Sequence, residues 1–149
     1  MSEIWFYHLQ RQRLEDALPA LLEKVLAAKK RAVVLLGSDE RVEAMNTYLW
    51  TYDERGFLPH GSARDGAAEL QPVWLTAKDE NPNRAEVLIL ADGAHSDAIG
   101  AYERCLELLD GNDESAVAAA RARWKHYREQ GHDVSYWQQD ARGKWERQA

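Results

Sequence analysis

Four side chains near the end of the chain have the types and spacing needed to bind an acidic ligand. They recur every three or four residues, which aligns them along one face of a helix, and we call them the basic stripe: Arg121, Trp124, Lys125 and Arg128. Residues 121–128 contain four Lys or Arg residues and no acid, although the whole chain has a formal net charge of -6. A row of cations beside an aromatic ring is typical of a docking face for an acidic, partly apolar partner.

A helix over about residues 114–130 has to present these side chains. Asp113 is a suitable N-cap, the interior is rich in alanine, and Gly131 follows the last helical position. At about 100° per residue, the basic stripe falls within an arc of about 100°, and Val117 lies inside the same arc. The positions expected to face the core are Ala116, Ala120 and Tyr127.

Two plainer interpretations of the basic stripe stay open. Lys and Arg in the second half of a helix complement the macrodipole, so the stripe is also consistent with an ordinary solvated face. Single-stranded nucleic acid is another possible ligand, with Trp124 as a stacking platform. The net charge of -6 and the lack of a second basic patch argue against nucleic acid.

Composition limits the class of protein. A chain of 149 residues that is 45% hydrophobic has room for one domain with a core. We expect one α/β domain over residues 1–137 and a loosely ordered C-terminal tail over 138–149 that is polar apart from Trp145. The single cysteine, Cys105, excludes an intramolecular disulfide and fits a reducing cytosol. No secretory signal and no membrane-spanning segment are predicted, so a cytoplasmic location is expected.

Hydrophobic patterning alternates between strands and helices. Apolar runs typical of buried strands cover residues 4–9, 32–36, 73–77 and 87–91. Amphipathic helices follow the first two runs, and the second helix begins after Ser38. Residues 96–110 fit both periodicities, and we expect a short helix followed by a strand over about 102–109. The pattern predicts an α/β fold with a mostly parallel sheet and helices on both faces.

The usual catalytic and cofactor motifs are missing from this sequence. No glycine-rich phosphate loop follows a predicted strand, and Asp39 and Glu40 stand where a phosphate would have to bind. The histidines form no HExxH motif or helical pair. We therefore expect no metal, no cofactor and no catalytic activity. The alternative is a small α/β enzyme or nucleotide-binding protein that uses a crevice near Gly37, Asp39 and Asp92.

A second surface is suggested by apolar residues at the end of the second predicted helix. The set comprises Tyr48, Leu49, Trp50, Tyr52, Phe57, Leu58 and Pro59. Consecutive positions of a helix cannot all face one core, and exposed Trp and Phe residues are common interface anchors. Either Trp50 or Phe57 lies at an interface, or both pack into a peripheral core.

Several of these segments together resemble the chi subunit of bacterial DNA polymerase III. The resemblance covers nearly the whole chain in order. Its most specific parts are Leu-Trp-Thr at 49–51 leading to Phe-Leu-Pro-His-Gly at 57–61, and the helix with Arg-Ala-Arg-Trp-Lys-His-Tyr-Arg at 121–128. Phe6, Tyr7 and Leu9 and the apolar run at 87–91 also fit the family.

The resemblance implies a non-catalytic accessory protein of the clamp loader with a Rossmann-like three-layer fold and no bound nucleotide. Such a protein pairs with the psi subunit and grips the acidic C-terminal tail of single-stranded DNA-binding protein. That tail ends in acidic residues, an apolar Pro-Phe pair and a free carboxylate. DNA is contacted only indirectly, and the subunit is expected to be a monomer when alone.

Site residues follow from the same resemblance. The tail would bind the basic stripe, with Val117 beside it, although some relatives have a lysine at that position. The second surface, Trp50, Phe57, Leu58 and Pro59, would receive psi or a helicase partner. Tyr136 and Trp137 either line the tail site or cover the sheet, and the sequence does not choose between these roles.

Overall fold

One mixed sheet forms the centre of the molecule. The computed structural model describes residues 2–10, 12–52, 58–140, 142 and 144–148. Within them, the sheet has eight strands in the order β3-β4-β2-β5-β6-β1-β7-β8. Neighbouring strands are parallel, except that β8 is antiparallel to β7. The strands are β1 (Glu3–Leu9), β2 (Ala32–Leu35), β3 (Gly61–Ser62), β4 (Val73–Thr76), β5 (Val87–Leu90), β6 (Arg104–Asp110), β7 (Asp133–Gln139) and β8 (Trp145–Arg147).

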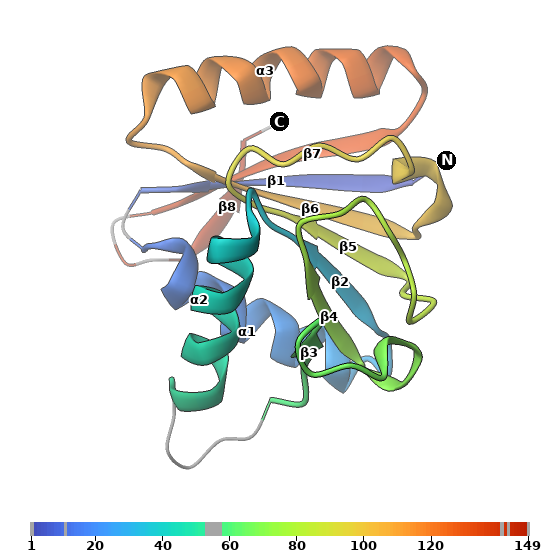
Figure 1. Ribbon diagram of the computed structural model, residues 1–149. Helices are drawn as coiled ribbons and strands as arrows, with labels where there is room; N and C mark the ends of the chain where they lie inside the picture. Colours follow the sequence, from blue (N-terminus) through green and yellow to red (C-terminus); the bar gives the residue numbers. More distant parts are fainter. Residues whose placement is uncertain (1, 11, 53–57, 141, 143, 149) are drawn as a thin grey trace.

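Helices cover both faces of this sheet. Helices α1 (Leu14–Ala27) and α2 (Asp39–Thr51) lie on one face, and α3 (Glu114–Glu129) lies alone on the other (Figure 1). The short 3-10 helices η1 (Ala68–Leu70) and η2 (Ile99–Ala101) lie in connecting segments. This arrangement confirms the predicted α/β class, with a mostly parallel sheet in a single Rossmann-like domain.

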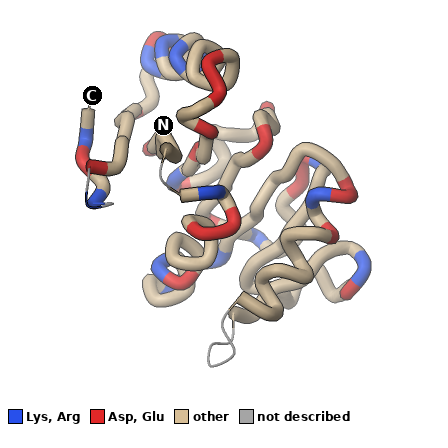
Figure 2. Tube along the Cα trace, turned by 90° about the vertical axis from the view of Figure 1, so that its left-hand side faces the viewer, with Lys and Arg blue, Asp and Glu red and all other residues tan. Residues whose placement is uncertain are grey.

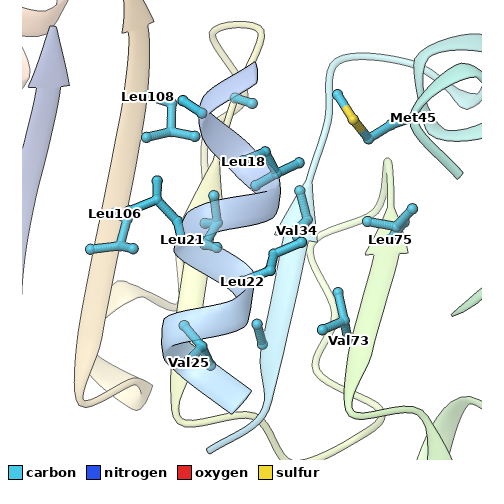
Figure 3. Close-up of a cluster of buried hydrophobic side chains, with 14 of the residues drawn as sticks. Leu18, Leu21, Leu22, Val25, Val34, Met45, Val73, Leu75, Leu106 and Leu108 are labelled. Carbon is cyan, nitrogen blue, oxygen red and sulfur yellow. The ribbon is translucent and has the colours of Figure 1, made fainter. Parts of the chain in front are cut away.

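The central strands are apolar throughout because both of their faces are buried. Strands β2, β4 and β5 have no exposed residue, which is the pattern of parallel strands covered by helices. Leu18, Leu21 and Leu22 of α1 pack against Val34 of β2 and Leu106 of β6 (Figure 3). Alternate residues of the same strands, such as Val33 and Leu88, belong to a second core on the other face of the sheet.

The ambiguous segment before α3 resolves as predicted into a short helix and a strand. η2 precedes β6, which lies between β5 and β1. Cys105 and Leu109 of β6 join the core beneath α3, whereas Leu106 and Leu108 join the core beneath α1. Alternate residues of β6 therefore face opposite sides of the sheet, as the strand pattern predicted, and not one side, as the helical pattern would require.

Part of the C-terminal segment beyond residue 137 belongs to the sheet. Gln138 and Gln139 continue β7, and β8 pairs with these residues. The ring of Trp145 meets the ring of Tyr7 edge-on, with 4.8 Å between their centroids. Strand β8 is otherwise polar, so the contact of Trp145 with Tyr7 is its apolar contact with the rest of the sheet, in addition to its pairing with β7.

A membrane-spanning helix is not found in the described part of the chain, since none of its helices has the required length and apolar character.

The turn from β6 to α3 provides a test of this packing. A β-carbon at Gly111 would clash with the imidazole ring of His8, which is buried and hydrogen-bonded to Tyr136. We expect Gly111→Ala to lower the free energy of unfolding by about 1–3 kcal/mol, because overpacking forces neighbours to shift. Gly100→Ala is the control, since its β-carbon would meet no atom within 4 Å. Urea unfolding of both variants measures the difference, and equal stabilities would contradict the proposed clash.

Candidate functional site

Helix α3 is fixed on the sheet by the residues predicted to face the core. The side chain of Asp113 caps the helix by accepting hydrogen bonds from the backbone N–H groups of Ser115 and Ala116, at 3.0 and 3.3 Å. Ala120 and Tyr127 are buried, and Ala116 is half-buried. The predicted helix and its orientation are therefore confirmed.

The basic stripe points away from this contact. Arg121, Lys125 and Arg128 are exposed, whereas Trp124 and Val117 are half-buried at the edge of the core. Figure 2 shows Lys and Arg segments grouped on α3. No ion pair found among the described residues includes any of the three exposed cations. Their charges are therefore not neutralised by direct pairing within the described chain.

One stripe cation is positioned by the aromatic ring beside it. The guanidinium carbon of Arg128 lies 4.9 Å from the centre of the Trp124 ring. This cation–π contact contributes about 0.5–1 kcal/mol at an exposed site and restricts the long arginine side chain. The indole Nε1 of Trp124 is buried and has no hydrogen-bond partner among the described residues. The surface of the stripe thus combines positive charge with an aromatic ring.

Arg123, the fourth cation of residues 121–128, has a different role. Its guanidinium Nε donates a hydrogen bond of 2.6 Å to Oε1 of Glu107, and Nη2 pairs with the same oxygen. The Glu107 side chain is only 4% exposed. Burial raises the pKa of Glu107, and the Arg123 cation opposes that rise. Sequence reasoning missed this pair, although a glutamate in the middle of an apolar strand was a signal that it needed a partner.

Tyr136 extends the surface beside the stripe, and Trp137 does not. The Tyr136 ring stacks on Phe6 with 6.1 Å between centroids, and its hydroxyl lies 2.7 Å from Nδ1 of His8. The Arg121 charge acts on both groups: it adds to burial in lowering the pKa of His8, and it opposes the burial that raises the pKa of Tyr136. Trp137 instead stacks on Trp5 on the opposite face of the sheet, at 5.3 Å.

The second predicted surface is only partly exposed. Trp50 is 48% exposed, and its ring lies 4.2 Å from that of buried His60. Leu58 is buried in the core beneath α2, so its side chain supports the surface and does not form it. Pro59 is half-buried. Phe57 lies outside the described residues.

Comparison with known proteins identifies the family. The family model described as "DNA polymerase III chi subunit, HolC" matches residues 1–135, a span that includes all of α3. The chain belongs to the DNA polymerase III chi subunit family. The resemblance noted in the sequence is thereby confirmed, and it places the chain among accessory subunits of a replicative polymerase.

Two chi relatives show how far the similarity extends. A protein of Rickettsia prowazekii (strain Madrid E) named "Probable DNA polymerase III subunit chi" is 33% identical over 90 residues, or 60% of this chain. The match spans about half, 54%, of that relative's length. The DNA polymerase III subunit chi of Escherichia coli (strain K12) is 24% identical over 143 residues, covering 91% of this chain and 97% of that protein.

The crevice near Gly37, Asp39 and Asp92, which was the alternative nucleotide site, is not arranged to bind a phosphate. Oδ2 of Asp92 accepts hydrogen bonds from the backbone N–H of Gly37 at 3.3 Å and from Nε of Arg41 at 3.0 Å. A cavity of about 780 Å³ nearby is lined by Asp92 and Arg41, but not by Gly37 or Asp39. No cluster of His, Cys, Asp and Glu side chains suited to a metal ion occurs in the described ranges. The amide that could hold a phosphate is thus already bound to a carboxylate.

The buried ion pair predicts a pH-dependent loss of stability. Arg123→Ala leaves Glu107 buried without its cation, which costs about 3 kcal/mol at neutral pH. The folded-state pKa of Glu107 then rises further above that of an unfolded glutamate, so the folded state binds the proton more tightly. The loss is therefore smallest below about pH 4.5 and grows as the pH rises through the folded-state pKa.

Urea unfolding at about pH 4.5 and pH 7.5 measures this effect. Arg121→Ala is the matched control, because it removes the same charge from the same helix without breaking an ion pair among the described residues. A loss for Arg123→Ala that is the same at both pH values would contradict the role given to Glu107.

Proposed function

We propose that this chi-family chain is a non-catalytic adaptor of the replisome. The basic stripe binds the acidic C-terminal tail of single-stranded DNA-binding protein, and the surface around Trp50 pairs with the psi subunit of the clamp loader or with a helicase. DNA is then reached only through the bound protein. The observation that carries this proposal is a row of cations with no ion pair among the described residues, beside a half-buried tryptophan on an acidic protein.

Charge supports the choice of an acidic ligand. Arg121, Lys125 and Arg128 rise along successive turns of one helix, so they match carboxylates spaced along an extended peptide. Arg128 is suited to the terminal carboxylate, because a guanidinium forms two parallel hydrogen bonds with it. Arg121 and Lys125 then face the acidic side chains of the tail.

Apolar contact supports a ligand that also carries an aromatic ring. Trp124 and Val117 are half-buried beside the cations, and the guanidinium of Arg128 already stacks on Trp124. The phenyl ring of a Pro-Phe terminus would pack on this surface next to Tyr136. Val117 adds apolar area where some relatives place a lysine, so this chain uses fewer charges and more packing in its tail site.

The site is small, and its affinity is correspondingly moderate. A short peptide held by a few ion pairs and one buried ring is expected to bind with micromolar affinity, or about -8 kcal/mol. Its binding weakens with salt, because the Debye length falls from about 10 Å at 0.1 M to about 3 Å at 1 M.

A titration with labelled tail peptide tests the site. Arg128→Ala is expected to weaken binding by about tenfold or more, because it removes a charge-assisted pair with the terminal carboxylate. Arg64→Ala is the matched control: Arg64 is 79% exposed and pairs only with Glu43 among the described residues. It removes the same charge from another surface and should leave peptide affinity nearly unchanged.

The same titration separates the rival functions. If the wild-type chain binds bare oligonucleotide and ignores the peptide, the stripe is a nucleic-acid site. If it binds a mononucleotide at the crevice, the enzyme or nucleotide-binding alternative gains support. Equal peptide affinity for wild type and Arg128→Ala means that the tail site is wrongly placed.

Trp50 is expected to anchor the second partner. Among the described residues, the exposed large apolar side chains are Trp50 and Leu70. Trp50→Ala should weaken binding of psi by about 2 kcal/mol, or roughly 30-fold, because aromatic anchors dominate interface energies. Tail-peptide affinity should stay unchanged.

Leu70→Ala serves as the comparison, since Leu70 is similarly exposed but lies on η1. Surface-immobilised psi provides the measurement. If Leu70→Ala weakens psi binding and Trp50→Ala does not, the psi interface does not include the end of α2.

A further inference from the structure

His8 is a buried polar residue in an otherwise apolar row of β1. It follows Ile4 and Phe6 on the face of the sheet that α3 covers, and it is only 7% exposed. A buried imidazole needs a hydrogen-bond partner, because an unpaired polar group in the interior costs free energy. Among the described residues this partner is Tyr136, whose hydroxyl oxygen lies 2.7 Å from Nδ1 of His8.

The other ring nitrogen of His8 determines which group donates in this bond. Nε2 is buried, lies against Gly111 and has no hydrogen-bond partner among the described residues. A hydrogen on Nε2 would be a buried donor without an acceptor, which is rarer in proteins than a buried acceptor without a donor. The hydrogen of the neutral ring is therefore assigned to Nδ1, so the imidazole donates and the oxygen of Tyr136 accepts.

This assignment leaves the hydroxyl hydrogen of Tyr136 for another acceptor. Tyr136 is half-buried, and stacking on Phe6 fixes the position of its ring. The exposed Arg121 of α3 acts electrostatically on both Tyr136 and His8, so its charge lies close to the pair. A hydroxyl donor next to a guanidinium group is suited to a carboxylate, which accepts hydrogen bonds from both.

We propose that the Tyr136 hydroxyl is a specificity-determining contact of the tail site. It donates a hydrogen bond to the carboxylate that pairs with Arg121, and His8 orients it for this role. The inference rests on the proposed adaptor function, because it concerns the same site. It adds a contact from β7 to the cations of α3, so the acidic ligand is held from two elements.

The spacing of the stripe identifies the acidic residue that is recognised. Arg121 and Arg128 are seven positions apart, or about 10 Å along the helix. An extended peptide advances about 3.3 Å per residue, so about three of its residues span this distance. With the terminal carboxylate at Arg128, the carboxylate at Arg121 and Tyr136 belongs to the residue three positions before the last. That residue is acidic in a tail that ends in acidic residues followed by Pro-Phe.

Titrations with two labelled peptides test this contact: the tail peptide, and the same peptide with Ala in place of that acidic residue. Tyr136→Phe keeps the ring that stacks on Phe6 and removes the hydroxyl. It is expected to weaken binding of the tail peptide about fivefold, because a hydrogen bond to a charged group is lost. The Ala peptide should bind Tyr136→Phe and wild type equally. His8→Leu removes the group that orients the hydroxyl, and it should show the same loss for the tail peptide alone.

Tyr102→Phe is the matched control. Tyr102 lies just before the beginning of β6, whereas His8 pairs with Leu109 near the end of that strand. Removal of the Tyr102 hydroxyl should leave the affinity for both peptides unchanged.

Four outcomes would overturn the inference. If wild type and Tyr136→Phe bind the tail peptide equally well, the hydroxyl is not a contact, and the adaptor function is unaffected. Equal losses with both peptides would mean that Tyr136→Phe disturbs the whole surface. If the effect of Tyr136→Phe disappears on amidation of the peptide terminus instead, the hydroxyl contacts the terminal carboxylate and the peptide runs in the opposite direction. A wild-type chain that binds neither peptide would contradict the adaptor function itself, and this inference with it.

Discussion

The attachment of α3 to the sheet is the constraint on which both candidate sites depend. Ala120 and Tyr127 are buried beneath the helix, and Arg123 forms an ion pair with buried Glu107. Because an α-helix has 3.6 residues per turn, fixing these positions also fixes the direction of every other side chain on it. Arg121, Lys125 and Arg128 then point to solvent on one side of the helix. The cavity lined by Ser115 and Ala119 lies on the other side. The two surfaces are consequences of one packing contact.

The distribution of ion pairs explains how an acidic protein can present a basic surface. Arg41, Arg104 and Arg123, which belong to three different elements, each contact a carboxylate. The cations of the stripe lack such a partner among the described residues and lie together on one face of α3, so this helix presents a local positive charge. Under the proposed function, this local charge attracts an acidic peptide, while the net charge of -6 disfavours general binding to nucleic acid.

Much of the fold could be predicted because its signals are local. The continuous apolar runs of β2 and β5 reflect burial on both faces, and Asp113 with Gly131 marks both ends of α3. The orientation of the stripe followed from the same helical periodicity. Two features could not be predicted. Arg123 looked like part of the basic cluster until the structure brought Glu107 of β6 against it, and Leu58 looked like an interface residue until it was found in the core.

The sequence by itself determined the identity of the elements, the family and the row of cations on one face of α3, because these depend on residues within a few positions of one another. Only the tertiary structure decided which charges are neutralised and which aromatic rings are accessible. Tyr136 and Trp137 are adjacent in sequence, yet one lies beside the stripe and the other stacks on Trp5 across the sheet. Burial and pairing are set by the order of the strands, which joins residues more than a hundred positions apart, and no local pattern encodes that order.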